Sequence, residues 1–522
     1  MSIGARHFDV VVLGRSLGAL CCAALLARRD FRVLVLGQAS KPAFYRYENR
    51  PLCRRPFTLV AGASPTWRRI LHELSQTPHF RRRTRTLDPM FVILEPGRRL
   101  EVAPDMELFA REIDREFSEV RQLVDELYST FAQVNARADA AFERDAVWPP
   151  GNLWERLETG RIAAGLPFAP GEGADCLSKF PAGHPYRQVV ALPALFATDL
   201  AASAEQLPPF ALARLHGAWT RGIVALAGGE DELADFLVER IRLHGGEVRL
   251  EDRATSLIVR RGIAAGVLVD GEDEATGADA IVTSTSGEAL ADLSGGQGIT
   301  RRARRDWPRL SVGAGRFVVS LVVKRAGLPD SLSHEAFVIP SSPRRPDPRR
   351  PIVHLQRFEC ADLPSGGAPD ESLLVAEALL PARGPLTLLE AREAVLATVR
   401  EHLPFIERHT LIVDSVHDGL PLTDHTTGTA RDIDRVHIPG SSAAAEPMLP
   451  LWTVEPAGYF DLAAEPLRGP VPGTFLVGRT VLPALGQEGE LLAALSVAHL
   501  ITRKDKHRQK MRRHLWTKLE TT

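Results

Sequence analysis

The first 36 residues constrain the fold of this chain more than any other segment does. The run DVVVL at Asp9–Leu13 is apolar and β-branched, which is typical of a strand buried on both faces of a parallel sheet. A glycine-containing turn then leads into a helix that ends near Arg29 and carries small residues on its inner face. A second buried strand, RVLVL, occupies Arg32–Leu36. This order predicts a βαβ unit at the start of a doubly wound α/β sheet.

The turn between this strand and helix has the spacing of a dinucleotide-binding loop, G-x-G-x-x-G/A. Gly14 stands at the first position, where the chain turns tightly, and Ala19 at the third, where the helix packs on the strand. The second position holds Ser16, whose side chain lies where phosphate oxygens usually approach the backbone. Because amides at a helix N-terminus attract a pyrophosphate, we expect the whole turn to contact a cofactor. The predicted contacts are Gly14, Arg15, Ser16, Leu17, Gly18 and Ala19.

The end of the second strand lacks the acidic residue that usually binds a ribose in this fold. The chain reads Leu36-Gly37-Gln38 where a carboxylate is expected. Gln38 offers a single hydrogen bond in its place, but losing a charge-assisted bond costs about 1.5–3 kcal/mol. Arg15 offers a compensating charge to the phosphates, unless it points into water. The sequence therefore predicts a dinucleotide site of weakened affinity.

The same turn also spells G-x-S-x-G, the nucleophile-elbow pattern of α/β-hydrolases, at Gly14, Ser16 and Gly18. An elbow serine normally follows several strands, and an earlier strand and loop supply the second oxyanion donor. Here the motif follows the first strand of the chain. A hydrolase is therefore the disfavoured interpretation.

Beyond this unit, helical and strand patterns alternate. Residues 105–144 carry apolar side chains on one helical face and predict one long helix, and residues 191–226 predict helices interrupted at Pro208-Pro209. Strands dominate residues 311–380, and a last strand precedes a helix from about 490 to 502. We predict an α/β fold in which a discontinuous Rossmann-like domain is interrupted by an inserted mixed α+β substrate domain. The expected bounds are 1–75, 215–300 and 455–505 for the first domain, 76–214 and 301–454 for the second, and 506–522 for a basic C-terminal tail.

The most specific motif lies near the C-terminus, in the segment GTFLVGRTVLPALGQEGELLAALSVAHLI. A strand ends at Gly478-Arg479, a Pro-x-x-Gly turn ends at Gly486, and a helix begins with the sequence Glu-Gly-Glu-Leu. This segment resembles the closing flavin-binding segment of the phytoene desaturase-like branch of the FAD-dependent amine oxidase superfamily. The resemblance implies an FAD-binding domain, in which Gly478 lies near the pyrophosphate and the amides of Gly489, Glu490 and Leu491 face the flavin. At such a helix N-terminus the helix dipole stabilises the negative charge of reduced flavin.

The middle of the chain, from Gly228 to Asp270, resembles the central block of the same family, where the backbone near Ala254 would hold the adenine. A Gly-Gly doublet that the family usually carries after its second strand is missing from residues 39–55. The N-terminal cofactor features are thus degraded, while the C-terminal one is kept. The cofactor-binding residues that the resemblance implies are Ala254, Gly478, Arg479, Gly486, Gly489, Glu490 and Leu491.

By this resemblance we expect an FAD-dependent oxidoreductase that dehydrogenates or isomerises an apolar substrate, isoprenoid or lipid-like. The alternative is a non-enzymatic or cofactor-weakened member of the flavoprotein fold that serves as a lipid-binding or scaffold protein. Ser16 and Gly37 favour the alternative, and the C-terminal motif opposes it. No catalytic acid or base is identifiable, because His354, His417 and His425 are each expected to be ordinary core or surface histidines.

Composition and charge exclude several other classes. The net charge of −1 gives no reason to expect a nucleic-acid partner. The five cysteines form no CxxC pair, and no histidine stands near them at ligand spacing, so no metal site is expected. The N-terminus has no signal-peptide pattern, and no apolar run is long enough to span a membrane. We therefore expect a cytoplasmic protein with free thiols.

The C-terminal tail differs in composition from the rest of the chain. Residues 503–518 read RKDKHRQKMRRHLWTK, and four of the seven lysines lie there, with Leu515 and Trp516 among them. One interpretation is a solvated extension of the last helix. The other is attachment to an anionic membrane surface, at about 1 kcal/mol per basic residue near the headgroups. That attachment would place the protein peripherally on the inner face of a membrane.

Overall fold

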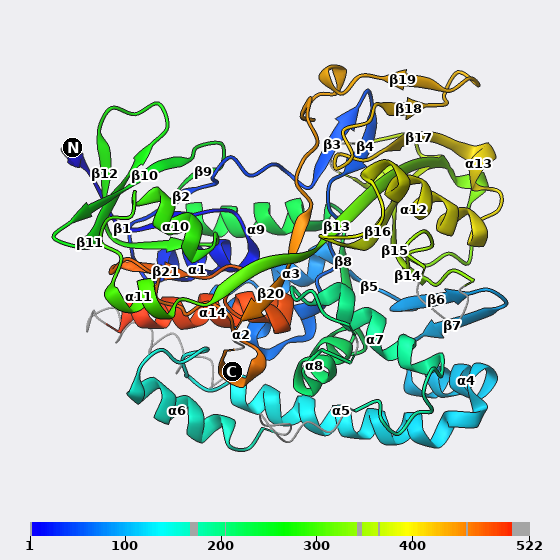
Figure 1. The fold of residues 1–522 in the computed structure, drawn as a ribbon, viewed down its shortest axis with the longest axis horizontal. Coiled ribbons are helices and arrows are strands. Elements are labelled where there is room, and N and C mark those ends of the chain that lie inside the picture. Colours follow the sequence, from blue (N-terminus) through cyan, green and yellow to red (C-terminus); the bar gives the residue numbers. More distant parts are fainter. Residues whose placement is uncertain are drawn as a thin grey trace.

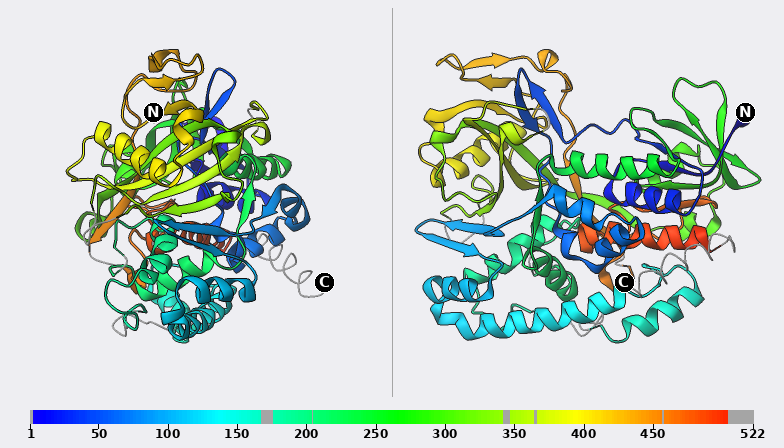
Figure 2. Two further views of the ribbon diagram at one scale, coloured as in Figure 1. Left: turned by 90° about the vertical axis from the view of Figure 1, so that its right-hand side faces the viewer. Right: turned by 180° about the vertical axis from the view of Figure 1, so that it is seen from behind.

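The computed structural model describes residues 3–166, 176–203, 205–341, 347–363, 366–455 and 458–503. Two β-sheets lie at opposite ends of the molecule, and a layer of helices runs beneath both of them (Figure 1). The view from behind in Figure 2 shows the same arrangement. The basic tail from residue 504 onward lies outside the described residues, as does part of the Pro/Arg loop at 341–351.

The first sheet has seven strands and contains the predicted βαβ start. Its order is β10-β11-β12-β1-β2-β9. Strand β21 also pairs with β12, along the carboxyl-terminal residues of that strand. The five strands β21, β12, β1, β2 and β9 are parallel, whereas β10 and β11 form an antiparallel extension. The bounds are β1 Ile3–Leu13, β2 Val33–Leu36, β9 Glu247–Arg249, β10 Ala254–Arg260, β11 Ile263–Val269, β12 Ala275–Thr283 and β21 Thr474–Leu476.

Helix α1 (Leu17–Arg28) follows β1 directly, and ten of its twelve residues are buried. It packs against α14 (Gly486–Thr502) on one side and against α9 (Gly229–Leu243) on the other. Small residues such as Cys21 and Cys22 make this possible, because they allow close approach on several faces of the helix. The short helices α10 (Gly287–Leu293) and α11 (Arg301–Asp306) complete this part of the chain.

The second sheet has ten strands in the order β19-β18-β17-β13-β16-β15-β14-β6-β7, and β20 pairs with β13. Strand β13 is 16 residues long, belongs to the second sheet along its whole length and runs across the molecule toward the first sheet (Figure 1). Its first half pairs with β20, and its second half pairs with β16 and β17. The bounds are β6 Phe91–Glu95, β7 Arg98–Val102, β13 Arg309–Lys324, β14 Glu335–Val338, β15 Val353–Glu359, β16 Glu371–Pro381, β17 Thr410–Asp414, β18 Leu422–Asp424, β19 Arg431–Ile433 and β20 Leu449–Glu455.

Helices α12 (Leu388–His402) and α13 (Ile406–His409) pack on this second sheet. Helix α12 begins with a capping box that Thr387 and Glu390 form. The remaining small elements are β3 Phe44–Tyr47, β4 Arg50–Cys53, α2 Pro65–Glu73, α3 Thr77–Arg83 and β5 Thr84–Thr86.

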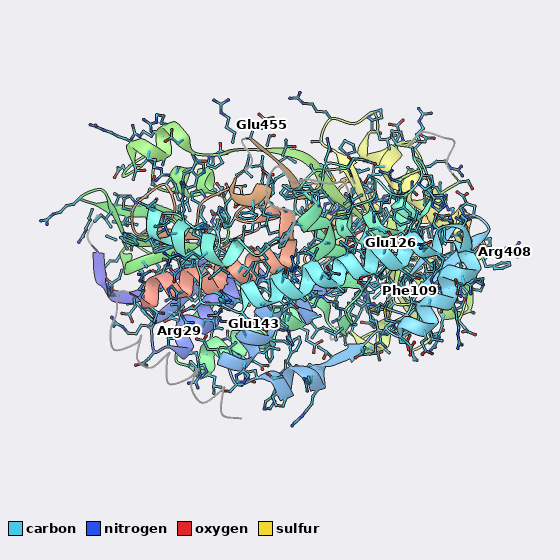
Figure 3. The ribbon with its side chains drawn as sticks, turned by 90° about the horizontal axis from the view of Figure 1, so that it is seen from below. Arg29, Phe109, Glu126, Glu143, Arg408 and Glu455 are labelled. Carbon is cyan, nitrogen blue, oxygen red and sulfur yellow. The ribbon has the colours of Figure 1, made fainter. Side chains whose placement is uncertain are left out.

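The predicted long helix over residues 105–144 is wrong, because the chain forms two helices there. Helix α4 (Met106–Glu116) ends at Phe117, whose backbone leaves the helical region, and α5 (Arg121–Phe142) begins after a short 3-10 turn. The break lets α4 pack on β7 while α5 packs on α8 (Pro209–Trp219). Figure 3 shows α5 crossing the underside of the molecule between Glu126 and Glu143. The apolar positions are nevertheless buried as predicted: Phe109, Ile113, Phe117, Val120, Val124 and Leu127.

The helices expected over residues 191–226 are also partly wrong. Helices α7 (Tyr186–Ala197) and α8 (Pro209–Trp219) form as expected around the proline pair, but Val224–Leu226 is a strand, β8. It pairs with β5, so a contact with a distant segment overrides the local preference. Helix α6 (Leu153–Ala163) completes the lower layer. Among the described residues, no helix has both the length and the apolar character needed to cross a membrane.

Candidate functional site

A cavity of about 640 Å³ lies between the two sheets. It begins at the N-terminus of α1 and extends past residues 39–60 to the inner face of β13, β15 and β16. This volume is within the range of sites that hold small molecules and cofactors. The first sheet contributes the carboxyl end of β1, which is where open α/β sheets bind their ligands.

The predicted turn takes the form that its residues suggest, with Ser16 as the N-cap of α1. Gly14 has φ +107°, a conformation that favours glycine. The Ser16 hydroxyl oxygen accepts a hydrogen bond from the amide of Ala19 at 3.3 Å. A Cβ at Gly18 would lie 2.1 Å from the carbonyl oxygen of Val477. Ser16 is therefore used for capping, and Gly18 is required for the packing of α1 against the loop after β21.

The glycines of the C-terminal motif are likewise required by the chain's own backbone. A Cβ at Gly478 would lie 2.2 Å from the Ser284 carbonyl oxygen, and one at Gly489 would lie 2.3 Å from that of Leu482. Gly486 has φ +51° and approaches the carbonyl of Ala197 equally closely. Leu491 is fully buried in α14. Close packing is therefore one reason for glycine at these positions, and the cofactor contacts stay a prediction.

The residues predicted to hold the ribose and the adenine bond to each other. The Gln38 side-chain oxygen accepts a hydrogen bond from the amide of Ala254 at 2.8 Å. The missing carboxylate also has a steric reason, since a Cβ at Gly37 would lie 2.0 Å from the carbonyl oxygen of Leu250. The backbone of residues 249–252 therefore lies against the end of β2, with hydrogen bonds from Gly37 and Gln38.

Five of the predicted residues line the cavity: Arg15, Ser16, Leu17, Arg479 and Glu490. Arg15 does not point into water, because its Nη2 donates to Asp231 at 2.7 Å. Arg479 donates through Nε to Asp199, also at 2.7 Å. Each guanidinium nevertheless keeps one buried nitrogen without a hydrogen-bond partner among the described residues, Nε of Arg15 and Nη1 of Arg479. Buried donors of this kind normally find an acceptor, so both sites suit an anionic group.

Glu490 brings a carboxylate to the N-terminus of α1. Its Oε2 accepts a hydrogen bond from the amide of Gly18 at 3.1 Å, and the residue is 6% exposed. Burial and then the charge of Asp199 raise the pKa of Glu490 to about 7, against the opposing effects of Arg479, the Gly18 amide and the Ser16 hydroxyl. The same helix N-terminus is where a pyrophosphate would bind in this fold.

The far end of the cavity contains a buried cluster of charged side chains. The two ring nitrogens of His354 lie 2.7 Å from Glu335 and 3.2 Å from Glu377. Burial alone would lower the pKa of His354, but hydrogen bonds to both carboxylates raise it to about 9. Arg316 donates to Glu377 at 3.1 Å and completes the cluster. The expected core histidine is thus a buried, ion-paired group at the wall of the cavity.

The other two histidines are ordinary, as expected. His417 is buried and contacts the carbonyl oxygen of Glu446, and its pKa is lowered mainly by burial. His425 is half-buried, and its amide donates to the Leu411 carbonyl. Among the described residues the cysteines form no disulfide with one another, and none of them lines the cavity.

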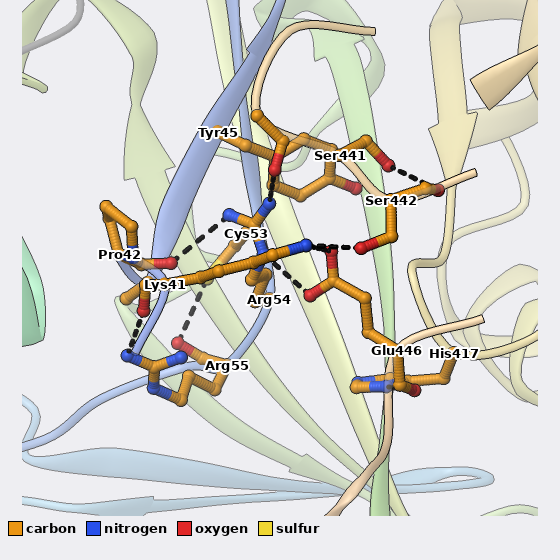
Figure 4. A network of polar contacts seen from close by, with 12 residues as sticks. Lys41, Pro42, Tyr45, Cys53, Arg54, Arg55, His417, Ser441, Ser442 and Glu446 are labelled. Carbon is orange, nitrogen blue, oxygen red and sulfur yellow. Dashed lines mark hydrogen bonds and ion pairs between the residues drawn. The ribbon is translucent and has the colours of Figure 1, made fainter. Parts of the chain in front are cut away.

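The mouth of the cavity is closed on one side by the segment 440–447, which ion pairs hold in place. Lys41 and Arg54 converge on the carboxylate of Glu446, at 2.8 and 2.9 Å (Figure 4). Lys41 also contacts the Ser442 hydroxyl, and Arg54 donates to the Gly440 carbonyl. The cation–carboxylate pairs at this mouth are therefore largely satisfied within the protein.

Most of the polar residues that complete this site were not predicted from the sequence. Asp199 and Asp231 bind the two predicted arginines, while Arg316, Glu335 and Glu377 surround His354. None of these residues belongs to a short motif, and Asp199 lies 280 positions from Arg479. Only the arrangement of the two sheets brings them together.

Neither a protein-family model nor a curated protein sequence matches this chain. Solved structures do resemble it. An oxidoreductase from Methanosarcina mazei is 16% identical over 94% of this chain and 99% of its own, with a TM-score of 0.57. A triple mutant of putrescine oxidase with redesigned cofactor binding is 15% identical over 96% and 99%, with a TM-score of 0.56. The PF1083 protein from Pyrococcus furiosus is 14% identical over 94% and 97%, with a TM-score of 0.53.

These likenesses extend over nearly the whole chain and over whole neighbouring chains. Together with the sheet topology they confirm the predicted fold class, a Rossmann-like α/β domain with an inserted mixed α+β domain. The likeness shows the fold, and the chemistry depends on the site.

Proposed function

We propose that this protein is an FAD-dependent oxidoreductase. The observation that carries the proposal is the cavity at the N-terminus of α1, whose wall contains Arg15 and Arg479. Among the described residues, each has one buried guanidinium nitrogen that lacks an acceptor. A pyrophosphate would supply acceptors to both, at the position where this fold binds dinucleotides.

The residues present fit this cofactor with one exception. Arg15 and Arg479 would each donate a hydrogen bond to the phosphates, and Ser16 would lie beside them at the start of α1. Glu490 opposes them, because it already accepts a bond from the Gly18 amide. When bound, the flavin supplies the hydride chemistry, while the protein supplies binding, orientation and electrostatics.

For the substrate we keep the proposal that follows from the phytoene desaturase resemblance, an apolar isoprenoid or lipid-like molecule that is dehydrogenated or isomerised. Phe57, Val60, Phe196 and Trp219 contribute apolar surface to the cavity. The charged groups of its far wall pair with each other, as Arg316 does with Glu377, so they do not need polar groups of a ligand as partners. These contacts support an apolar substrate class within the same cavity.

A second candidate is a cofactor-weakened or non-enzymatic member of this fold that serves as a lipid-binding or scaffold protein. Two contacts favour it. The Glu490 carboxylate lies at the helix N-terminus, and Gln38 takes the Ala254 amide that would otherwise face the adenine. Both contacts occupy groups that a dinucleotide would use.

The two candidates differ in whether purified protein carries or takes up flavin. The first measurement is the visible absorbance of the protein as isolated. If the protein is colourless, FAD is added, unbound flavin is removed and the absorbance is measured again. We expect the absorption bands of protein-bound oxidised flavin. A protein that is colourless and also retains no added FAD would contradict the first candidate and favour the second.

We further propose that the tail at residues 503–518 attaches the protein to an anionic membrane surface. The support is its sequence alone, because residues beyond 503 lie outside the described ones. The full chain should co-sediment with vesicles that contain phosphatidylserine, whereas a chain ending at residue 503 should stay in solution. High salt should abolish this difference. Equal sedimentation of both forms would contradict the proposal.

A further inference from the structure

Glu490 is the one carboxylate in the described cavity wall whose principal contact is a backbone amide. The other acidic residues of the wall each pair with a cation, as Glu230 does with Arg55 and Glu446 with Lys41. Glu490 forms no ion pair within 4 Å among the described residues, and its Oε2 bonds to the amide of Gly18. A fully buried carboxylate at this position acts as an internal substitute for an anionic ligand of α1.

The groups around Glu490 come from several elements. Gly18, Ser16 and the buried thiol of Cys21 face it from α1 and the turn before it. Asp199 follows α7 and Arg479 follows β21, and these two are paired with each other. Glu230 of α9 acts on Arg479 from farther away. A second anion entering this space meets two existing carboxylates, Asp199 and Glu490, of which Asp199 already has its cation.

We propose that Glu490 couples cofactor binding to the uptake of one proton, so that its carboxylate is neutral whenever a pyrophosphate occupies the N-terminus of α1. This inference rests on the proposed function. The proton comes from solvent and is held on a carboxyl oxygen of Glu490. The physical reason is electrostatic, because a second negative charge beside the same amides in a buried site is strongly unfavourable.

The protonation state of Glu490 is adjustable near neutral pH. Burial and Asp199 raise its pKa to about 7 in the absence of a ligand. The pyrophosphate diester of FAD carries the same charge between pH 6 and 8, and His354 at the far end stays protonated there because its pKa is raised to about 9. Between about pH 8 and pH 6, full coupling of this kind makes FAD binding roughly ten-fold tighter.

The experiment is a titration of the apoprotein with FAD at pH 6, 7 and 8, followed by flavin fluorescence. Calorimetry at pH 8 in two buffers of different ionisation enthalpy measures the protons taken up. The wild type should bind about ten-fold more tightly at pH 6 and should take up close to one proton per FAD at pH 8. Glu490→Gln should bind at pH 8 as tightly as the wild type does at pH 6, with no pH dependence and no proton uptake.

Glu446→Gln is the matched control. Glu446 also lies in the cavity wall, but Lys41 and Arg54 hold its pKa low against the effect of burial, so it stays ionised throughout this range. This variant should keep the pH dependence of the wild type, whatever its affinity. If Glu490→Gln does not fold, the proton uptake of the wild type decides the matter alone.

The outcomes distinguish a failure of the proton coupling at Glu490 from a failure of the proposed function. FAD binding by the wild type with no pH dependence and no proton uptake would overturn the role of Glu490 and leave the proposed function intact. Failure of both the wild type and Glu490→Gln to bind FAD at any of these pH values would overturn the proposed function itself.

Discussion

The side-chain oxygen of Gln38 accepts a hydrogen bond from the backbone amide of Ala254 at 2.8 Å, joining the end of β2 to the start of β10. The backbone of Gln38 also has φ +57°, a left-handed conformation that costs a non-glycine residue about 1–2 kcal/mol. The position thus combines a stabilising side chain with an unfavourable backbone. A cofactor that used the Ala254 amide would have to displace this side chain.

These two contributions predict different effects for two substitutions of Gln38. Gln38→Ala removes the hydrogen bond and keeps the backbone cost, so the free energy of unfolding should fall by about 0.5–1.5 kcal/mol. Gln38→Gly removes the same bond but relieves the backbone, so its loss should be about 1 kcal/mol smaller. Urea unfolding of both variants measures the difference. Equal losses would mean that the left-handed backbone carries no cost here.

Gly18→Ala should destabilise the protein although alanine is the better helix former. The added Cβ would lie 2.1 Å from the Val477 carbonyl oxygen, and overpacking of this kind costs about 1–3 kcal/mol or more. Gly160→Ala is the control, since Gly160 lies in α6 and a Cβ added there would meet no described atom within 4 Å. That variant should gain up to about 1 kcal/mol. Thermal unfolding of the two proteins should therefore move in opposite directions.

Arg214→Met should cost about 3–5 kcal/mol, because it leaves a buried carboxylate without its cation. Arg214 is 1% exposed and donates through Nε to Glu488 at 2.9 Å. Adding Glu488→Gln should recover part of the loss by removing the buried charge. Arg305→Met is the comparison, because the pair of Arg305 with Asp306 is exposed to solvent and should contribute little to stability. Denaturant unfolding of the single variants and of the double variant measures these effects. A small loss of stability for the single variant Arg214→Met would contradict the expectation.

The His354 cluster predicts how stability depends on pH. The pKa of His354 is raised to about 9 in the folded protein, above the value of 6.5 for an ordinary histidine. Its contribution is therefore fully present below about pH 6.5 and is lost as the pH rises toward 9. The free energy of unfolding should fall over this range in the wild type. His354→Gln should remove most of that slope, and an unchanged slope would show that other groups cause it.

Local sequence was sufficient for the elements whose stability depends on their own residues. The apolar runs of β1 and β2 predicted the parallel strands. The apolar face from Phe109 to Leu127 predicted burial correctly even where the helix itself was wrong. These features follow from periodicity, capping and turn chemistry, which act over a few residues.

The composition of the site could not be predicted in this way. The motif glycines looked like ligand contacts, yet Gly18, Gly478 and Gly489 face the backbone of other segments. Gln38 and Ala254 were predicted as separate cofactor contacts, and the fold brings them into contact with each other. A motif records that a close approach is needed at a position, but it does not say whether a ligand or another part of the chain makes that approach.

The sequence by itself thus determined the βαβ start, the class of the fold and the segments that meet at the N-terminus of α1. Only the tertiary structure decided which charges lie there. The carboxylate of Glu490 reaches the amide of Gly18 across 472 positions, and Asp199 reaches Arg479 across 280. The physical reason is that ion pairs and buried charges depend on distances between segments, and those distances follow from the packing of both sheets around α1 and α14.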